Sequence, residues 1–513
     1  MKQVDLIVTG GWVIPAHDLP YITNGAVAVS DGKVLEVGKV KDLLGRYPQA
    51  QKVVGNNGYL IMPGLINSHS HGRGLSDFQR GALDNTLETW RLNSPGYVPV
   101  PTKEDVMFSA IRLLKSGVTA TMHNHIVRGN AESINQQCQQ AIEAYREVGI
   151  RSLFCLGIKN ANPWVYGDNE KFMNNLSQKA QKTLNTSSES FEISDYFSIV
   201  RNLYNTYKKD QKTRIGFGPV APQWCSEDLL LNVKEEADYL GVSIHLHTLQ
   251  TVFQKIYSLQ MYGKSYIEYL FDLGLLDNNL VLGHCVYPTT KDIKLMAENE
   301  VGVTHHPTCN LRQRNGISPI FHMLNNGVTV GLGIDGKSIN DDDDFIQEMK
   351  VCRILHRLPS LELDSPCLTN HQIFKMSTDN GANLIGFKGE IGRLEPGYKA
   401  DIVLLDVKNM TYPYTYDEHD PIDILLYRGG GRYVDTVLVQ GEIVLEKGRP
   451  TKVDEVHITN KLAEFASQRP SKKVKDLRDA LAEVRHETAH FFSGWTNKID
   501  YDPYYIFNSK KDG

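Results

Sequence analysis

Residues 59–71 read YLIMPGLINSHSH, an apolar run that is interrupted by Pro63-Gly64 and ends in two histidines one residue apart. A short continuous apolar run between turn residues is typical of a strand that is buried on both faces. Residues i and i+2 of a strand point to the same side, so His69 and His71 should face the same way. The segment therefore predicts a buried strand that carries two imidazoles at its carboxyl end.

Seven further apolar runs follow, with helical patterns such as KEDVMFSAIRLLKSG (103–117) between them. Such alternation is typical of parallel strands covered by helices, and eight is the number of strands that closes a barrel. We therefore predict an α/β fold, a (β/α)8 TIM barrel over residues 58–387. The seven runs are GVTATMHNH (117–125), IRSLFCLGI (150–158), TRIGFGPV (213–220), GVSIHLH (241–247), NLVLGHC (279–285), VGVTHHP (301–307) and GVTVGLGID (327–335).

The two ends of the chain follow a different pattern. In residues 1–57 and 388–455, apolar and polar residues alternate around turns such as Asp31-Gly32. This alternation is typical of antiparallel strands with one buried face. We expect the two ends to combine into one composite β-sandwich beside the barrel, followed by a charged helical tail over residues 456–513. Residues 160–212 are too long for a simple connection and are expected to be an insertion.

The composition excludes several classes of function. The chain has 55 Lys and Arg residues and 60 Asp and Glu residues, so its net charge is -5. This charge balance gives no excess of positive charge for binding nucleic acid or an anionic membrane. No apolar run approaches the roughly 18 residues that a membrane-spanning helix needs. The seven cysteines are scattered without a Cys-x-x-Cys pair, which argues against a disulfide framework and favours the cytoplasm.

Histidines gather at the ends of the predicted strands. There are three His-x-His pairs, and the sixth, seventh and eighth strands end near His284, His305 and Asp335. The carboxyl ends of barrel strands converge on one face, where imidazoles and one carboxylate suit Zn²⁺ first and Fe²⁺, Mn²⁺ or Co²⁺ next. The alternative is that these histidines only form hydrogen bonds inside the barrel. The pairs are His69/His71, His123/His125 and His245/His247.

Several of these segments resemble the metal-dependent amidohydrolase superfamily, in particular the branch of adenosine-type and guanine deaminases and triazine hydrolases. They are PGLINSHSH, LVLGHCVYP, VTHHPTCNLR, GLGIDG and GRLEPGYKADIVLLD, and the resemblance covers residues 1 to 450. It implies metal-assisted attack of water on a C–N bond, other than a peptide bond, in a cyclic amidine, amide or heterocyclic small molecule. It also implies the metal ligands His69, His71, His247 and Asp335, with His284 holding the water and polarising the substrate, and Asp335 taking the proton. We further expect a homo-oligomer.

Two positions depart from that family. Its deaminases carry His-x-x-Glu on the fifth strand, whereas this chain has His247-Thr248-Leu249-Gln250, and an amide cannot relay a proton. Its GPHxP segment here reads GPVAP (218–222), without the histidine. We therefore expect Gln250 to orient substrate or water, and two alternatives stay open. One is a hydrolytic dechlorinase or C–S hydrolase, and the other is a degenerate barrel that binds without turnover.

Residues 213–220 contain neither lysine nor glutamate, so a carboxylated-lysine bridge between two metals is not expected, and one metal per chain is predicted. Further residues that could line the substrate pocket lie at the ends of the predicted strands and in the loop after the first strand. Packing or solvated roles are the alternative for each. The candidates are Arg73, Arg80, Trp90, His123, His125, Trp224, His305 and Asn310.

A rival motif lies in the tail, where His486-Glu487-Thr488-Ala489-His490 matches the HExxH zinc motif of metallopeptidases. Only 23 residues follow His490, which leaves little room for a third ligand. The surrounding sequence has the pattern of an amphipathic helix, so we interpret this segment as structural.

Overall fold

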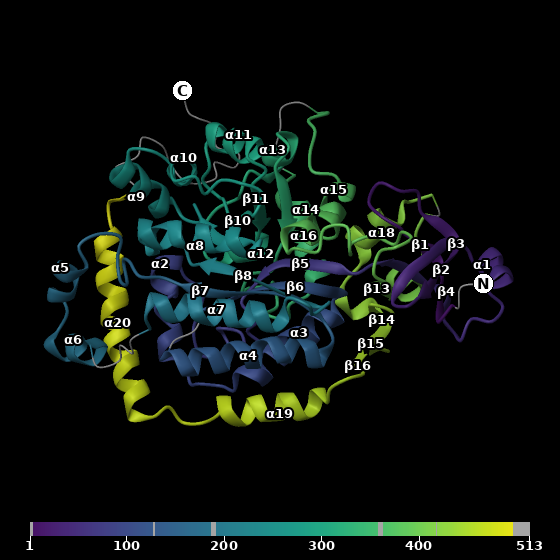
Figure 1. Cartoon of the computed structure of the whole chain (residues 1–513). Helices are drawn as coiled ribbons and strands as arrows, with labels where there is room; N and C mark the ends of the chain where they lie inside the picture. Colours follow the sequence, from purple (N-terminus) through teal and green to yellow (C-terminus); the bar gives the residue numbers. More distant parts are fainter. Residues whose placement is uncertain (1–3, 127–128, 186–190, 358–362, 417, 496–513) are drawn as a thin grey trace.

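The computed structural model describes residues 4–126, 129–185, 191–357, 363–416 and 418–495, and eight parallel strands form a barrel in it (Figure 1). Each strand pairs with the next along the chain. The circle closes where Ser70 bridges Asp335 and the Asp335 amide donates to the carbonyl of His69 at 2.9 Å. The strands are β5 (Leu65–Ser70), β6 (Val118–His125), β7 (Arg151–Ile158), β8 (Thr213–Pro219), β9 (Ile244–Thr248), β10 (Leu280–His284), β11 (Gly302–His305) and β12 (Thr329–Leu332).

Helices surround the barrel, and their ends follow local sequence rules. For example, Ser226 accepts a hydrogen bond from Leu229 N at the start of α8, and Gly241 ends that helix with φ 65°. The helices between the strands are α3 (Thr102–Lys115), α4 (Ala131–Val148), α7 (Ile193–Tyr207), α8 (Glu227–Leu240), α10 (Tyr266–Asp272), α11 (Thr290–Glu298), α13 (Ile320–Asn325) and α14 (Phe345–Leu355). Shorter or accessory helices are α1 (Val40–Arg46), α2 (Leu87–Trp90), α5 (Asn169–Asn174), α6 (Gln178–Asn185), α9 (Val252–Tyr262), α12 (Pro307–Arg312), α15 (Asn370–Met376), α17 (Val407–Met410) and α18 (Pro421–Arg428).

One end of the barrel interior is filled by apolar side chains. Helix α16 (Asp379–Leu384) and the residues after it pack there against inward-facing residues of β5, β6 and β7. His245 also lies at this end, because its Nε2 is 3.1 Å from the carbonyl of Leu384. Functional side chains are therefore confined to the opposite end, where the strands finish.

The two ends of the chain build the second sheet, as expected. It is one continuous sheet in the order β3-β2-β1-β4-β13-β14-β15-β16, antiparallel throughout except for the β1–β4 pair. A bridge between Lys33 and Lys399 brings its two halves together around a shared apolar core. Its strands are β1 (Leu6–Val13), β2 (Ile22–Ser30), β3 (Lys33–Lys39), β4 (Lys52–Pro63), β13 (Ile402–Asp406), β14 (Val434–Val439), β15 (Glu442–Glu446) and β16 (Arg449–Pro450).

The domain boundary expected between residues 57 and 58 falls inside β4. The Asn56-Asn57-Gly58 segment, which has the composition of a turn, is a bulge: Asn56 pairs with Gly10 and Leu60 with Trp12. A bulge lets the strand continue through residues that would otherwise end it. The same strand therefore runs through the second sheet to Pro63 and leads directly into the barrel.

The tail and the insertion pack together on the side of the barrel away from the second sheet (Figure 1). Helix α19 (Glu455–Ala466) lies along α3, and α20 (Lys472–Phe492) contacts α6 and the loop after β5. Residues 496–513, the last part of the expected helical tail, lie outside the described residues. No helix of the described part is both long and apolar enough to cross a membrane.

A buried ion pair joins the barrel to the second sheet. Arg151, at the start of β7, donates from Nε and Nη2 to the two carboxylate oxygens of Asp401 at 2.8 and 3.0 Å. Asp401 directly precedes β13 and also accepts a hydrogen bond from the amide of Gln440. Both side chains of the pair are almost inaccessible, at 0% and 1% exposure, so removal of one partner would leave a buried charge unpaired.

We predict that Asp401→Ala lowers the free energy of unfolding by about 3–5 kcal/mol, because Arg151 keeps its charge and loses its partner. Urea or thermal unfolding of the purified variant measures this change. The double change Arg151→Met/Asp401→Leu should recover much of the loss, since no buried charge remains. An Asp401→Ala variant as stable as the wild type would show that the pair is not a stabilising link.

Candidate metal centre

Imidazoles from two strands meet at the open end of the barrel. His69 and His71 come from the end of β5 and its exit, and His247 from β9, and one ring nitrogen of each lies within 4.8 Å of the others. His69 and His247 are buried, and His71 is nearly so. The structure therefore brings together the three histidines that the sequence nominated as ligands.

A bulge in β5 is what turns both of its histidines inward. Asn67 pairs with Thr121 and Ser70 with His123, so β5 advances three residues while β6 advances two. One extra residue reverses which side chains face the interior. Before the bulge, Ile66 points into the apolar core that fills one end of the barrel interior. After the bulge, His69 and His71 point toward the histidine cluster at the other end.

Backbone carbonyls fix the tautomers of two of these histidines. His71 Nδ1 lies 2.9 Å from the carbonyl oxygen of Asn124, and His247 Nδ1 lies 2.7 Å from that of Val220. A carbonyl only accepts, so Nδ1 of each ring carries a proton, and Nε2 is the nitrogen turned toward the site. Burial lowers the pKa of His247 to about 3, which keeps the ring neutral.

Asp335 faces these imidazoles from the end of the last strand. Its Oδ1 is 2.9 Å from Nε2 of His71 and 3.9 Å from Nε2 of His69. Its Oδ2 accepts a hydrogen bond from the thiol of Cys309 at 2.9 Å. Burial alone would raise the pKa of this carboxyl, but the hydrogen bond from Nε2 of His71 holds it well below its usual value. Asp335 is therefore an anion in a buried site.

His284 completes the group from β10. Its Nδ1 donates to Oδ1 of Asn310 on α12 at 2.8 Å, so Nε2 carries the lone pair. That Nε2 is buried, lacks a hydrogen-bond partner among the described residues, and lies 3.7 Å from Oδ2 of Asp335. Burial lowers the pKa of His284, so the neutral imidazole presents an acceptor to the same space as Asp335.

The backbone is strained where these side chains leave their strands. His284 has φ 71°, Asp335 φ 62° and Leu249, two residues after His247, φ 50°. Residues other than glycine rarely adopt this left-handed conformation, and such strain gathers at functional sites.

A divalent metal fits this donor set. His69, His71 and His247 offer imidazole nitrogens, and Asp335 adds one carboxylate, the mixture that zinc and its first-row neighbours accept. Nε2 of His69 is buried without a hydrogen-bond partner among the described residues, a costly state that a bound metal would relieve.

His306 faces the site although its sequence context did not single it out, and its neighbour His305, expected to line the pocket, does not. Strand alternation puts Thr304 and His306 on the inner side, where the His306 ring stacks on His69 with centroids 4.5 Å apart and lies 4.4 Å from His284. His305 therefore points the other way, toward His356 on the helix side of β11. Two consecutive histidines at a strand end indicate that one faces inward, but only the pairing shows which one.

His123 and His125 are also placed differently from the expectation. Ala120 and Met122 of β6 face the interior core, so the two histidines face outward. His123 Nδ1 lies 3.1 Å from the hydroxyl of Tyr145 on α4, and its Nε2 lies 3.1 Å from Nδ1 of His125. These two residues support the wall of the site and do not face Asp335.

The other nominated residues surround the mouth of the barrel. Gln250 is buried and donates from Nε2 to Oε1 of Gln313 at 3.0 Å. Beside it, Thr251 donates to the buried carboxyl of Glu88, which the sequence analysis did not single out; burial raises the pKa of Glu88. Trp224 is buried against Tyr166.

The loop after β5 closes over the mouth through one acidic side chain. Asp77 accepts hydrogen bonds from Trp90 Nε1 at 2.9 Å, from the hydroxyl of Tyr97 at 2.7 Å and from Lys337 Nζ at 3.1 Å. Lys337 follows the last strand by only a few residues, so this contact fastens the loop to the strand that carries Asp335. Arg73 and Arg80 border the same loop, with Arg73 Nη1 4.0 Å from Asp77 and the Arg80 guanidinium over the Tyr97 ring.

The HExxH motif of the tail is not a metal site in this structure. Within the described residues, α20 buries a stripe that includes Val484 and Thr488 and leaves His486 and His490 exposed to solvent. The interpretation of this segment as a packing helix agrees with its contacts.

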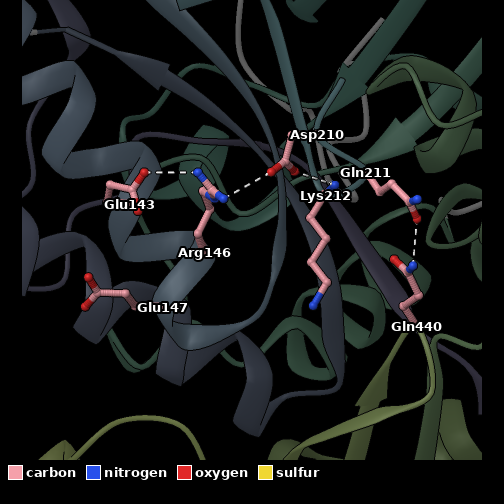
Figure 2. A pocket seen from close by; sticks show the side chains of 7 residues that line it. All are labelled: Glu143, Arg146, Glu147, Asp210, Gln211, Lys212 and Gln440. Carbon is pink, nitrogen blue, oxygen red and sulfur yellow. Dashed lines mark hydrogen bonds and ion pairs between the residues drawn. The ribbon is translucent and has the colours of Figure 1, made fainter. Parts of the chain in front are cut away.

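A surface pocket of about 490 Å³ lies at the opposite end of the barrel, near the start of β7 and β8 (Figure 2). Its charged groups already have partners: Arg146 contacts Glu143 at 3.1 Å and Asp210 at 3.3 Å. Lys212 and Glu147 form ion pairs with residues outside the pocket. Nothing in this pocket resembles the histidine cluster, and it lies at the end of a barrel that seldom carries catalysis.

Residues 60–444 of the chain match the amidohydrolase family. The chain belongs to the amidohydrolase family. Residues 25–50 also match an imidazolonepropionase-like composite domain of bacteria. The chain is therefore a hydrolase that acts on carbon–nitrogen bonds, as the sequence predicted.

Two relatives show the range of the similarity. The chain is 29% identical to a 5'-deoxyadenosine deaminase of Methanosarcina mazei, over 91% of this chain and 98% of that protein. It is 30% identical to a 5-methylthioadenosine/S-adenosylhomocysteine deaminase of Caldanaerobacter subterraneus, over 78% of this chain and 85% of that protein.

Solved structures share the fold. An adenosine deaminase from Xanthomonas campestris with bound zinc superposes with a TM-score of 0.76 at 24% identity, covering 94% of this chain and 99% of that one. A variant of an atrazine chlorohydrolase from Arthrobacter aurescens, complexed with zinc and atraton, gives 0.77 at 22% identity, covering 90% of this chain and 100% of that one.

We predict that His71→Ala lowers the metal content by about one equivalent per chain and abolishes activity, because a three-imidazole site loses one ligand. Elemental analysis of the purified protein measures the first effect. The double change His486→Ala/His490→Ala is the matched control and should leave metal and activity intact. Loss of metal in the control alone would move the site to the tail.

Proposed function

We propose that this amidohydrolase binds one divalent metal, zinc in the first instance, at the barrel mouth and removes an amino group from a nitrogen heterocycle. The observation that carries the proposal is the convergence of His69, His71, His247 and Asp335 on one buried point, with the lone pair of His284 facing the same space. The names of the relatives support amino-substituted purine nucleosides as the first class to test.

A metal held there would supply Lewis acidity and lower the pKa of a bound water. The two acceptors on either side of that space, His284 Nε2 and Asp335 Oδ2, are 3.7 Å apart and can accept both protons of one water. Asn310 holds the His284 ring so that Nε2, and not Nδ1, points at the water. Asp335 is ionised and takes the proton as the water attacks the electrophilic carbon.

The leaving amine must also gain a proton. Gln250 cannot supply it, because an amide is neither an acid nor a base at ordinary pH. Asp335 is the group that has just received one, and it can pass that proton on. Gln250, fixed by Gln313, orients the substrate by hydrogen bonding. The two relatives described above are named deaminases. They therefore give no support to the alternatives of hydrolytic dechlorination, C–S hydrolysis or a non-catalytic barrel.

The substrate is a small molecule in this proposal. The cytoplasm remains the proposed location, supported by seven cysteines that are all free thiols. A homo-oligomer also remains a proposal.

We expect the zinc-loaded protein to release ammonia from at least one of 5'-deoxyadenosine, 5-methylthioadenosine, guanine or an amino-triazine. A coupled ammonia assay measures this, with His284→Ala as the inactive control that keeps the metal. If no compound of the panel releases ammonia from fully metallated protein, amine removal from these heterocycles is excluded.

Gln250→Glu should lower activity on the native substrate. The change removes the donor to Gln313 and adds a negative charge at the barrel mouth, where Asp335 is already an anion, which raises the cost of charge build-up in the transition state. Gln250→Ala should also lose activity yet keep its metal, because Gln250 is not among the ligands. A tenfold or larger rise in the turnover of Gln250→Glu would contradict this prediction. Such a rise corresponds to an activation free energy lowered by about 1.4 kcal/mol, and it would show that a proton-relaying side chain at position 250 speeds the reaction.

A further inference from the structure

A second cluster of metal-binding side chains lies behind β11, on its helix side. His305 at the end of β11 faces Cys352 and His356, which are one helical turn apart at the end of α14. All three side chains are buried. The cluster is distinct from the barrel mouth, because strand alternation points His305 away from His306 and its neighbours.

The donor atoms of this cluster converge. Nε2 of His305 lies 3.0 Å from Nε2 of His356, and one ring nitrogen of each histidine and the Cys352 sulfur lie within 4.8 Å of one another. A hydrogen bond between the two imidazoles does not satisfy the group, since Nδ1 of His305 is buried without a hydrogen-bond partner among the described residues.

The kinds of donor in this cluster favour a borderline or soft cation. His305 and His356 supply imidazole nitrogens, and Cys352 supplies a sulfur. Two imidazoles and one thiol are the borderline and soft donors that zinc selects over magnesium or calcium.

We propose that His305, Cys352 and His356 bind a second divalent metal ion, zinc or a metal of similar preference, separate from the catalytic one. Binding replaces the S–H bond of Cys352 by a metal–sulfur bond, and the proton leaves to solvent. Three protein ligands leave a fourth position for a further donor.

The location suggests what such an ion would do. It would tie the end of β11 to α14, and β11 leads directly to His306 and to Asn310, which holds the His284 ring. A structural metal contributes folding energy where it joins two elements. The second site would therefore brace the segment that orients the catalytic histidine.

Cobalt substitution tests the proposal, because a Co²⁺–thiolate bond gives an ultraviolet charge-transfer absorption that nitrogen and oxygen ligands do not. The wild-type protein loaded with Co²⁺ should hold two metals per chain and show this absorption. His71→Ala should lose one metal and keep the absorption. Cys352→Ser should lose the other metal together with the absorption.

Cys309 supplies the matched control, since its sulfur is 2.9 Å from Asp335 at the catalytic cluster. Cys309→Ser should keep the thiolate absorption if the signal comes from Cys352. His356→Gln retains the thiol and should still lose the second metal, which covers the case in which Cys352→Ser fails to fold; circular dichroism checks the fold of each variant.

One metal per chain in the wild type without a thiolate absorption would overturn the proposal and leave a hydrogen-bonded histidine pair. So would an absorption that disappears in Cys309→Ser and persists in Cys352→Ser. Neither result would affect the catalytic metal, whose own test is the loss of metal in His71→Ala.

Discussion

The hydrogen bond from the Asp335 amide to the His69 carbonyl closes the barrel, and the chemistry of the site depends on it. It holds the last strand against the first, although the two residues are far apart in sequence. The same contact places the Asp335 carboxylate beside the imidazole of His71. Closure of the fold and assembly of the ligands are thus one event, because the segment after β12 that closes the barrel against β5 also carries the carboxylate.

Neutral imidazoles make this assembly possible. Several histidines crowd into one end of the barrel, and protonated rings at 4–6 Å would repel one another strongly in a buried site. Burial lowers the pKa of His69, His247, His284 and His306, which keeps these rings uncharged. A carbonyl or an amide oxygen decides which nitrogen of His247 and His284 holds the proton. Asp335 then supplies the negative charge among these imidazoles, and this charge favours the binding of a cation.

The sequence predicted the strands, their order and the strand ends that carry ligands. Each apolar run is long enough to be recognised as a strand without knowledge of the strands that pair with it. It did not predict which side of a strand end faces inward. In β5 a bulge decides this, and bulges depend on pairing with β6. Periodicity alone could therefore not show that His306 faces inward and His305 outward. Nor could it show that His123 and His125 face outward. The link between Arg151 and Asp401 was equally inaccessible, since it joins residues that only the folded sheets bring together.

The second sheet has a consequence for how the chain is made. Its central pair joins β4, complete by residue 63, to β13, which begins at residue 402. During synthesis, the first strands therefore wait with an open edge until nearly the whole protein has emerged, and closing so large a loop carries an entropic cost. The barrel, whose strands pair in the order in which they are translated, can form in the meantime. Newly made chains are thus most prone to aggregate through their amino-terminal strands, during the interval before the carboxyl-terminal strands arrive to cover them.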